Sequence, residues 1–345
     1  MKKIPPGYIL PSAAFTIKPS QICHYDFIDK PPEIGDVVYG SIIRICQHSD
    51  LENKWGRIHR INDGTRAIFV FGNRYATDAF EGIIPESFQS NVDLMARSGI
   101  IGMVRISNTR MKDPSRVKIL GYACDKEGKR LNTREYPLIK PRIHKKKTSR
   151  SKLILVVGTA MNSGKSASAA ACCWALSTMG YKVRGSKITG TAGLKDILHM
   201  EDAGAGIVND FSYFGFPSTY LLDPKDLMQI FNDLDLKYGN NLKNYWVVEI
   251  ADGILQRETS ILLSDKTVTG RIHRLILSAQ DTFGALGGLH QLREHYGLVP
   301  DAISGVCSSS PLSIRELSHL TDIPVFNNIS WDLKMLSDIL IGSKS

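Results

Sequence analysis

Hydrophobic and polar residues follow two different patterns along the chain. Residues 35–139 alternate apolar and polar positions in short runs such as VVYGSIIRIC and TRAIFVFGNR, which predicts a series of short strands. From residue 153, continuous apolar runs such as LILVVG alternate with helical patterns, as in strands buried on both faces of a parallel sheet. We therefore expect an α/β fold: a doubly wound, mostly parallel sheet, preceded by a small β-rich barrel or sandwich.

The same patterns divide the chain into four segments. These are a Pro-rich extended arm (1–34), a β-rich basic domain (35–139), a basic linker (140–152) and a nucleotide-binding domain (153–345). One helix is expected within the β-rich domain, at 90–99. In the last domain we expect strands at 182–188, 218–222, 245–251, 274–280, 302–308 and 324–328, with helices at about 193–207, 223–237, 284–297 and 311–321.

Composition indicates an ordinary globular protein, with 43% hydrophobic and 22% charged residues. The six cysteines have neither CxxC nor zinc-site spacing, so we interpret them as reduced core residues. No signal peptide and no apolar run of about 18 residues is found. The expectation is a cytoplasmic protein with no membrane partner.

The net charge of +9 is unevenly distributed. Residues 1–150 hold 26 Lys and Arg against 15 Asp and Glu, whereas residues 151–345 hold 17 against 19. The basic half interleaves arginines with aromatic residues, which permits nucleic-acid binding. An anionic small substrate, or simple covering of the second domain, explains the charge equally well. The residues concerned are Arg57, Arg60, Arg66, Arg74, Arg105, Arg110, Trp55, Phe69, Phe71 and Tyr75.

A glycine-rich loop follows the first apolar run of the second domain. It reads Gly158-Thr159-Ala160-Met161-Asn162-Ser163-Gly164-Lys165-Ser166, and Ala167 begins an Ala-rich helical pattern. The usual phosphate-binding loop has four residues between its glycines, and this one has five. Strand, loop and helix still occur in the required order, so backbone N–H groups and the helix N-terminus would face a phosphate. Lys165 would contact the β- and γ-phosphates, and Ser166 would bind Mg²⁺; an incidental Gly-Lys-Ser turn is the alternative.

This longer loop resembles that of dethiobiotin synthetase and its relatives, including the cobyrinic acid amide synthases. GSKITGTA resembles the lysine motif on the family's second strand, which implies a catalytic role for Lys187 beside Lys165. MEDAGAG and VVEIADG resemble its two acidic segments, which implies that Asp202 and Glu249 hold Mg²⁺ with Ser166. The resemblance covers residues 153–330 and implies a homodimer. The chain also resembles an uncharacterised family with a similar C-terminal P-loop domain.

The matching residues also have a physical logic. Ligands of doubly wound sheets lie at the carboxyl ends of the strands, where all of these residues are expected. Two lysines would neutralise a triphosphate, and hydroxyl and carboxylate oxygens suit Mg²⁺. The chain departs from the family at Ile250 and Asp252, which replace glycines. It also has no asparagine in GVCSSSP, the segment where the family reads adenine, so ATP is the default nucleotide and GTP stays open.

These observations favour a Mg²⁺- and ATP-dependent enzyme that activates a small carboxylate or carbamate by γ-phosphoryl transfer. The small-molecule substrate is expected to be anionic. Two alternatives remain: a nucleotide-controlled nucleic-acid-binding protein, and a polynucleotide kinase whose β-rich domain precedes a similar loop. For Asp281, after another apolar run, we favour a helix cap over substrate contact.

Overall fold

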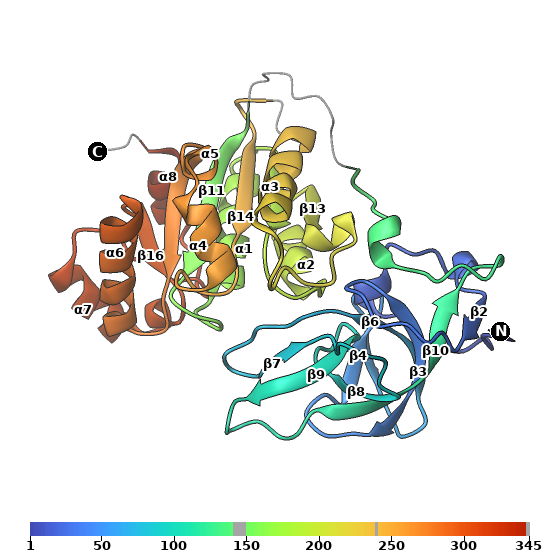
Figure 1. The fold of residues 1–345 in the computed structure, drawn as a ribbon. Coiled ribbons are helices and arrows are strands. Elements are labelled where there is room, and N and C mark those ends of the chain that lie inside the picture. Colours follow the sequence, from blue (N-terminus) through green and yellow to red (C-terminus); the bar gives the residue numbers. More distant parts are fainter. Residues whose placement is uncertain (141–149, 239–240, 343–345) are drawn as a thin grey trace. The chain divides into compact units, whose positions relative to one another are not determined.

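The computed structural model describes residues 1–140, 150–238 and 241–342, which form two compact units (Figure 1). The first unit comprises residues 1–140 together with two short segments, 190–195 and 211–221. The second comprises the other described residues. The sequence assigned both short segments to the nucleotide-binding domain, so the chain returns to the first unit twice. Most of the expected basic linker, residues 141–149, lies outside the described residues.

The first unit contains a closed five-stranded barrel. Each barrel strand pairs with the next in the order β3, β6, β9, β8 and β10, and β10 pairs back with β3. Only the β6–β9 pair among these five is parallel. The strands are β3 (Val37–Arg44), β6 (Arg66–Phe71), β8 (Asn91–Leu94), β9 (Ile100–Ser107) and β10 (Ser115–Cys124). Of the two expected architectures, barrel or sandwich, the structure is therefore the barrel.

Further strands extend this barrel. Two strands of the N-terminal arm, β1 (Lys2–Lys3) and β2 (His24–Asp26), continue the sheet beyond β10. On the other side, β7 (Phe80–Ile83) pairs with β9. A separate hairpin is formed by β4 (Asp50–Glu52) and β5 (Ile58–Arg60). Short 3-10 helices occupy Ser12–Ala14, Pro19–Gln21 and Thr133–Glu135.

The helix expected at 90–99 is wrong, because this segment supplies strand β8. Val92 and Leu94 are fully buried in the barrel core. Between them, Asp93 is also buried, where it pairs with Arg116 at 2.6 Å and accepts a hydrogen bond from the amide of Val104 at 2.9 Å. Its two partners compensate for the burial of this carboxylate. Val92, Asp93 and Leu94 do alternate as in a strand, but a strand of four residues is too short for the sequence pattern to separate it from a helical one.

The second unit contains a six-stranded parallel sheet in the order β13-β12-β14-β11-β15-β16. Figure 1 shows helices on both faces, as expected of a doubly wound fold. Helices α1, α2 and α8 share one core with the sheet, while α3 and α6 contact its other face. The strands are β11 (Lys152–Gly158), β12 (Val183–Lys187), β13 (Ile207–Asp210), β14 (Tyr245–Glu249), β15 (Ile272–Ser278) and β16 (Ala302–Ser304).

The helices agree less completely with the expectation. Three α-helices were not expected from the sequence: α4 (Arg257–Ser264), α5 (Lys266–Thr269) and α8 (Leu333–Ile341). The 3-10 helix Phe211–Phe214 was not expected either. The others are α1 (Lys165–Thr178), α2 (Lys195–Asp202), α3 (Pro224–Tyr238), α6 (Thr282–Tyr296) and α7 (Pro311–Leu320). Among the described residues, no helix is both long and apolar enough to cross a lipid bilayer.

Three strand expectations need correction. Segments 218–222 and 324–328 form single bridges, Thr191↔Ser218 and Ile303↔Val325, in place of strands. The expected strand at 302–308 ends at Ser304, where Gly305 has a positive φ of 105° and a 3-10 helix, Val306–Ser309, follows. The expected helix at 193–207 is also too long: it stops at Asp202, and β13 begins at Ile207.

Candidate nucleotide-binding site

The loop Gly158–Lys165 has the conformation that an anion requires. Strand β11 ends at Gly158, and helix α1 begins at Lys165. Asn162 and Gly164 have positive φ values of 54° and 95°, so the backbone curls and consecutive N–H groups form a concave nest. A side chain at Gly164 would lie 2.8 Å from the Cα of Gly305, so glycine is required there on two grounds.

Helix α1 continues this site into the core. Its Ala-rich sequence favours helix and lets it lie close to the sheet, where nine of its residues are buried. The N-terminus of this 14-residue helix carries partial positive charge, which favours a phosphate group. Loop and helix together therefore form a positive end placed directly after the central strand β11.

Lys165 lies folded over the loop. Its ammonium donates a hydrogen bond to the carbonyl oxygen of Ala160 at 2.7 Å, and the residue is only 5% exposed. Burial lowers the pKa of Lys165, although the charges of Glu249 and Asp252 oppose this effect. A bound phosphate would supply the negative charge that a buried ammonium lacks.

Parallel pairing brings the other charged residues to the same edge. Lys187, the last residue of β12, is the register partner of Glu249, the last residue of β14. The Ser166 hydroxyl lies 3.2 Å from Oε1 of Glu249 and 3.0 Å from Oδ1 of Asp196. The other oxygen of Asp196 accepts a hydrogen bond from the Lys187 ammonium. Two carboxylates, one hydroxyl and two lysines therefore surround the start of α1.

The surroundings of Glu249 disfavour the charged form of its carboxylate. Glu249 is 2% exposed, and its burial, together with the neighbouring charge of Asp196, raises its pKa to about 7. Burial also opposes the charge of Lys187, but Asp196 and Glu249 outweigh this effect and hold its pKa above its ordinary value. Lys187 is therefore charged at neutral pH, whereas Glu249 is close to its midpoint.

The residues present fit a Mg²⁺ ion. Oε2 of Glu249 is buried without a hydrogen-bond partner among the described residues, directly beside the Ser166 hydroxyl and the Asp196 carboxylate. Buried polar atoms normally have a partner, so this oxygen has free capacity to bind a cation. Hard oxygen ligands of this kind are those that Mg²⁺ prefers, and phosphate and water would complete its shell.

The structure does not bring Asp202 to this cluster. Asp202 is exposed at the last position of α2, whereas Asp196 in the first turn supplies the carboxylate that contacts Ser166 and Lys187. Six residues of helix separate the two, or about 9 Å along the axis. The sequence offers one signal for Asp196, an acidic residue in the first turn of the helix that follows the Lys187 strand.

The segment expected to read the base also lies beside the loop. The amide of Val306 donates to the carbonyl of Ser163 at 3.1 Å, which places Cys307–Ser309 next to the phosphate site. Sequence reasoning missed Asn328, which is buried and donates through Nδ2 to the carbonyl of Gly164 at 3.2 Å. Asp281 is confirmed as a helix cap, because its Oδ1 accepts a hydrogen bond from the amide of Gly284 at 2.6 Å.

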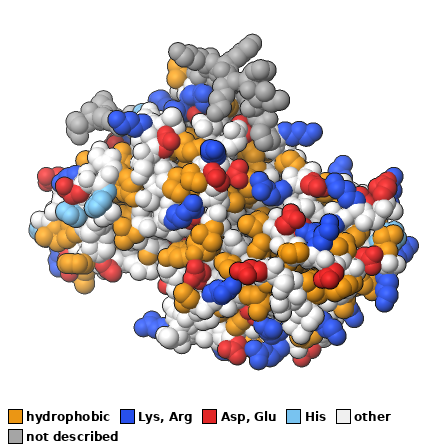
Figure 2. Space-filling model, viewed as in Figure 1, with side chains coloured by type: hydrophobic (Ala, Val, Ile, Leu, Met, Phe, Trp, Pro, Cys, Tyr) orange, Lys and Arg blue, Asp and Glu red, His pale blue; other side chains and the backbone are white. Residues whose placement is uncertain are grey.

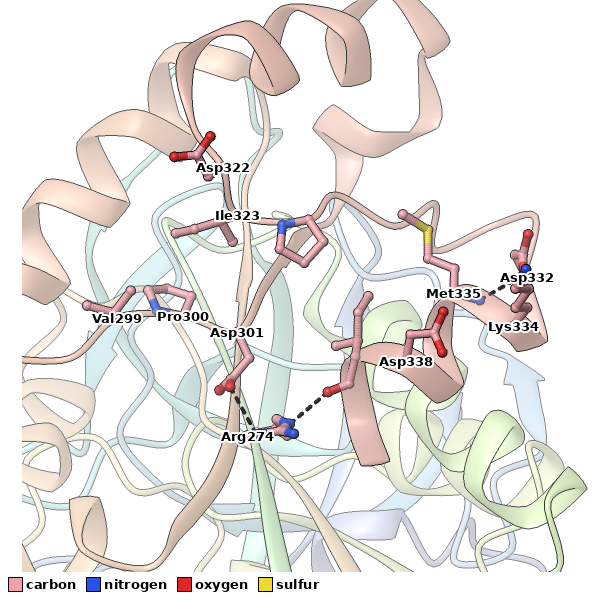
Figure 3. A pocket seen from close by; sticks show the side chains of 12 residues that line it. Arg274, Val299, Pro300, Asp301, Asp322, Ile323, Asp332, Lys334, Met335 and Asp338 are labelled. Atoms are coloured by element: carbon pink, nitrogen blue, oxygen red, sulfur yellow. Dashed lines mark hydrogen bonds and ion pairs between the residues drawn. The ribbon is translucent and has the colours of Figure 1, made fainter. Parts of the chain in front are cut away.

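A second cavity of about 940 Å³ lies elsewhere in this unit (Figure 3). It is lined by Arg274, near the start of β15, and by Asp301, directly before β16, so it opens at the amino ends of the strands. Figure 3 shows Arg274 turned toward Asp301. Arg274 donates to Asp301 at 3.3 Å and to the carbonyl of Ile339 at 2.7 Å. Its charge anchors α8 to the sheet, at the edge opposite to the loop.

Comparisons with known proteins add little to this geometry. No model of a protein family matches the chain, and no curated protein matches it. Solved structures match at low similarity. The signal recognition particle receptor FtsY from Elizabethkingia anophelis, in complex with GDP, is 13% identical over 61% of this chain and 69% of its own, with a TM-score of 0.35. A ParA family ATPase from Chlorobium tepidum is 14% identical over 56% and 89%, also with a TM-score of 0.35.

Similarity at this level carries no functional argument. The class of the second unit follows from its own geometry: a parallel sheet, a phosphate-binding loop after the central strand and charged residues at the carboxyl edge define a P-loop nucleotide-binding fold. The resemblance to dethiobiotin synthetase stays a prediction.

Proposed function

We propose that the chain is a Mg²⁺- and ATP-dependent enzyme that transfers the γ-phosphoryl group to a small carboxylate or carbamate. The observation that carries this proposal is the cluster of Lys165, Ser166, Lys187, Asp196 and Glu249 around one loop. A phosphate-binding nest beside hydroxyl and carboxylate oxygens and two lysines suits Mg-nucleotide and a phosphoryl group, and positioning and charge stabilisation supply most of the catalysis of phosphoryl transfer.

The residues divide into two groups by role. The loop amides and Lys165 would bind the phosphates, while Ser166, Asp196 and Glu249 would hold Mg²⁺. When bound, Mg²⁺ neutralises charge on the phosphate oxygens and fixes their orientation. Its arrival would also relieve the repulsion between Asp196 and Glu249, whose proximity raises the pKa of Glu249.

Lys187 would act on the transferred group. In the reaction, an acceptor oxygen attacks the γ-phosphorus, the bond to the β–γ bridging oxygen breaks, and ADP leaves with the electron pair. Lys187 would have to exchange its present partner Asp196 for the developing charge, which Mg²⁺ binding by Asp196 would permit. An amine would then attack the carbonyl carbon of the resulting acyl phosphate, the C–O bond to the phosphate would break, and an amide and inorganic phosphate would form. No side chain need form a covalent bond.

The expected anionic substrate has one constraint at this edge. Asp252 follows β14 in a loop fixed on both sides, because the amide of Ile250 donates to Val156 at 3.0 Å and that of Ile254 to Gly158 at 2.8 Å. Its charge acts on both Lys165 and Lys187. An anionic acceptor must therefore reach the lysines along a path that avoids repulsion by the Asp252 carboxylate. A site with glycine at this position would not have this constraint.

The homodimer implied by the resemblance is part of the proposal. Phe283 and Leu312, in the first turns of α6 and α7, are 86% and 63% exposed. A hydrogen bond of 3.0 Å joins Thr282, the first residue of α6, to Glu316 in the second turn of α7, so the two helices lie side by side and their exposed apolar residues are offered as one surface. Light scattering of the wild type and of Phe283→Ser would test it: a dimer that the variant dissociates is expected, and a monomeric wild type would contradict it.

Hydroxylamine trapping tests the reaction directly. Purified protein is incubated with Mg-ATP or Mg-GTP, hydroxylamine and a panel of small carboxylates and amines with bicarbonate. An acyl phosphate yields a hydroxamate, which is expected with one nucleotide and absent in Lys187→Gln. Lys182→Gln, an exposed lysine at the start of the same strand, is the matched control and should retain activity.

Two results would contradict the proposal. Nucleotide hydrolysis without any hydroxamate from the panel would leave an NTPase without acyl transfer. Phosphate transferred to the 5′-hydroxyl of an oligonucleotide, offered as a separate acceptor, would establish the polynucleotide kinase alternative instead.

A further inference from the structure

The β4–β5 hairpin of the first unit presents a rigid loop. The side-chain oxygen of Asn53 accepts hydrogen bonds from the amides of Trp55 and Arg57, both at 3.0 Å. The amide of Gly56 donates to the carbonyl of Asn53 at 2.9 Å, and Gly56 has a positive φ of 79°. A tight turn with three hydrogen bonds to one residue fixes the backbone of the loop, so little backbone entropy is lost on binding.

An aromatic ring stands at the tip of this loop. Trp55 is 74% exposed, although tryptophan is usually largely buried. The Lys54 ammonium lies 4.4 Å from the centre of its ring, and Ile58 beside it in the hairpin is 44% exposed. Because the Lys54 ammonium lies over one face of the indole, the opposite face is the one offered for stacking, at a position that the backbone fixes.

Basic side chains surround the ring. Arg57 and Arg60 are exposed on the same hairpin, with Arg60 at 80% exposure. Arg97 is also exposed, and its carbonyl accepts a hydrogen bond from the amide of Glu52 at 2.9 Å, which places it beside the hairpin. Two acidic residues are present, but Glu52 is buried and bonded to the amide of Leu194 at 2.8 Å, and Asp50 lies 4.0 Å from Arg60. Figure 2 shows lysine and arginine side chains over the visible face of this unit, with acidic and hydrophobic side chains between them.

We propose that this hairpin surface, Lys54, Trp55, Arg57 and Arg60, binds single-stranded nucleic acid. A base would stack on Trp55, while the flanking lysine and arginines contact phosphates on either side. The opposite charge of the strand complements the surface, and the exposed indole face selects for unpaired bases, since those of a duplex already stack on one another. This inference is independent of the proposed phosphoryl transfer, because it concerns the other unit.

The test measures fluorescence anisotropy of labelled dT12 and rU12 with the full chain, without nucleoside triphosphate, at 50 and 200 mM salt. Trp55→Ala is expected to weaken binding at least about fivefold, whereas Trp55→Phe keeps a stacking face and should stay within about threefold. The triple variant Lys54→Gln, Arg57→Gln, Arg60→Gln should lower the slope of log affinity against log salt by about 2, since single strands give about 0.7 per phosphate contact.

Controls separate the site from general charge. A second triple variant, Lys112→Gln, Lys118→Gln, Lys126→Gln, removes the same charge from exposed positions outside the hairpin and should retain the wild-type salt slope. Trp55 is exposed, so its variants should unfold at the wild-type temperature, which a circular dichroism melt checks.

Four results would overturn the proposal. The first is equal oligonucleotide affinity of the wild type and Trp55→Ala, and the second is an equal decrease of the salt slope in both triple variants. The third is a duplex of the same length that binds as tightly as the single strand. The fourth is binding to phosphatidylserine vesicles in place of either oligonucleotide. None of them would affect the hydroxamate assay, so failure here and failure of the proposed reaction are distinguishable.

Discussion

Removing the Glu249 carboxylate should stabilise the folded chain at alkaline pH. Burial and Asp196 raise the pKa of Glu249 from 4.5 to about 7. At about 1.4 kcal/mol per pKa unit, ionising this group costs the folded state about 3 kcal/mol above neutral pH. Between these two values the folded state binds more protons than the unfolded state, so stability falls as pH rises through the window. Glu249→Gln removes the penalty, and we expect a gain of about 1 to 3 kcal/mol at pH 8 and almost none at pH 4.5.

Urea denaturation at pH 4.5, 6, 7 and 8 measures this effect. Three of the four tryptophans, Trp174, Trp246 and Trp331, belong to the second unit, so a Trp55→Phe background makes the fluorescence report that unit alone. Asp202→Asn is the control, because it removes a carboxylate from an exposed position on α2 and should change stability by less than about 0.5 kcal/mol at every pH.

The pH dependence decides between two explanations. A gain confined to high pH identifies the buried charge as the cause. A loss of stability at all four pH values would refute the reasoning, because the hydrogen bond to Ser166 would then matter more than the desolvated charge. An equal gain in stability at pH 4.5 and pH 8 would also refute the reasoning. At low pH the side chain at position 249 is neutral in the folded wild type and in Glu249→Gln alike, so a buried charge cannot cause the difference.

Other predictions follow from the same geometry. Asp196→Asn should remove the Mg²⁺ dependence of nucleotide affinity, whereas Asp202→Asn should leave it unchanged. A Mg²⁺ titration of nucleotide binding with both variants measures this. If only Asp202→Asn lost the Mg²⁺ dependence, the roles assigned to the two residues would be reversed. Burial raises the pKa of Cys172 to about 12, so a thiol-reactive dye should label the half-buried Cys23 and Cys46 of the native chain quickly, and the four buried cysteines only after unfolding. Rapid labelling of more than two thiols in the native chain would contradict this. Asp281→Ala should lower the unfolding free energy by about 1 kcal/mol through loss of the cap of α6, without changing nucleotide affinity; a large change in affinity would instead assign Asp281 to the site.

The phosphate-binding loop and the helix after it could be predicted from the sequence, because residues close together in the chain determine their conformation. The apolar run of β11, the glycines of the loop and the alanines of α1 each favour the conformation they adopt, so loop and helix could be located from residues 153–179 alone. Lys187 and Glu249 were also predictable, since each ends a strand and the carboxyl ends of parallel strands meet at one edge.

Other features depend on contacts distant in sequence. Which acidic residue of α2 faces Ser166 depends on how the helix lies against α1. The prediction named Asp202, whereas Asp196 makes this contact in the structure. The two short segments of the first unit could not be recognised either. Tyr220 there donates to Glu81 and Leu194 to Glu52, partners that lie more than 100 residues earlier in the chain.

Calorimetric titration with Mg-ATP and Mg-GTP tests the central claim, that the loop binds nucleotide, most directly. The wild type should bind at least one of them with an affinity that falls when Mg²⁺ is removed. Lys165→Ala should weaken binding about tenfold or more, because a buried charged hydrogen bond is lost, while the exposed-lysine control Lys182→Ala should bind like the wild type. Binding that is equal in Lys165→Ala and the wild type, or no binding of either nucleotide by the folded wild type, would contradict the account.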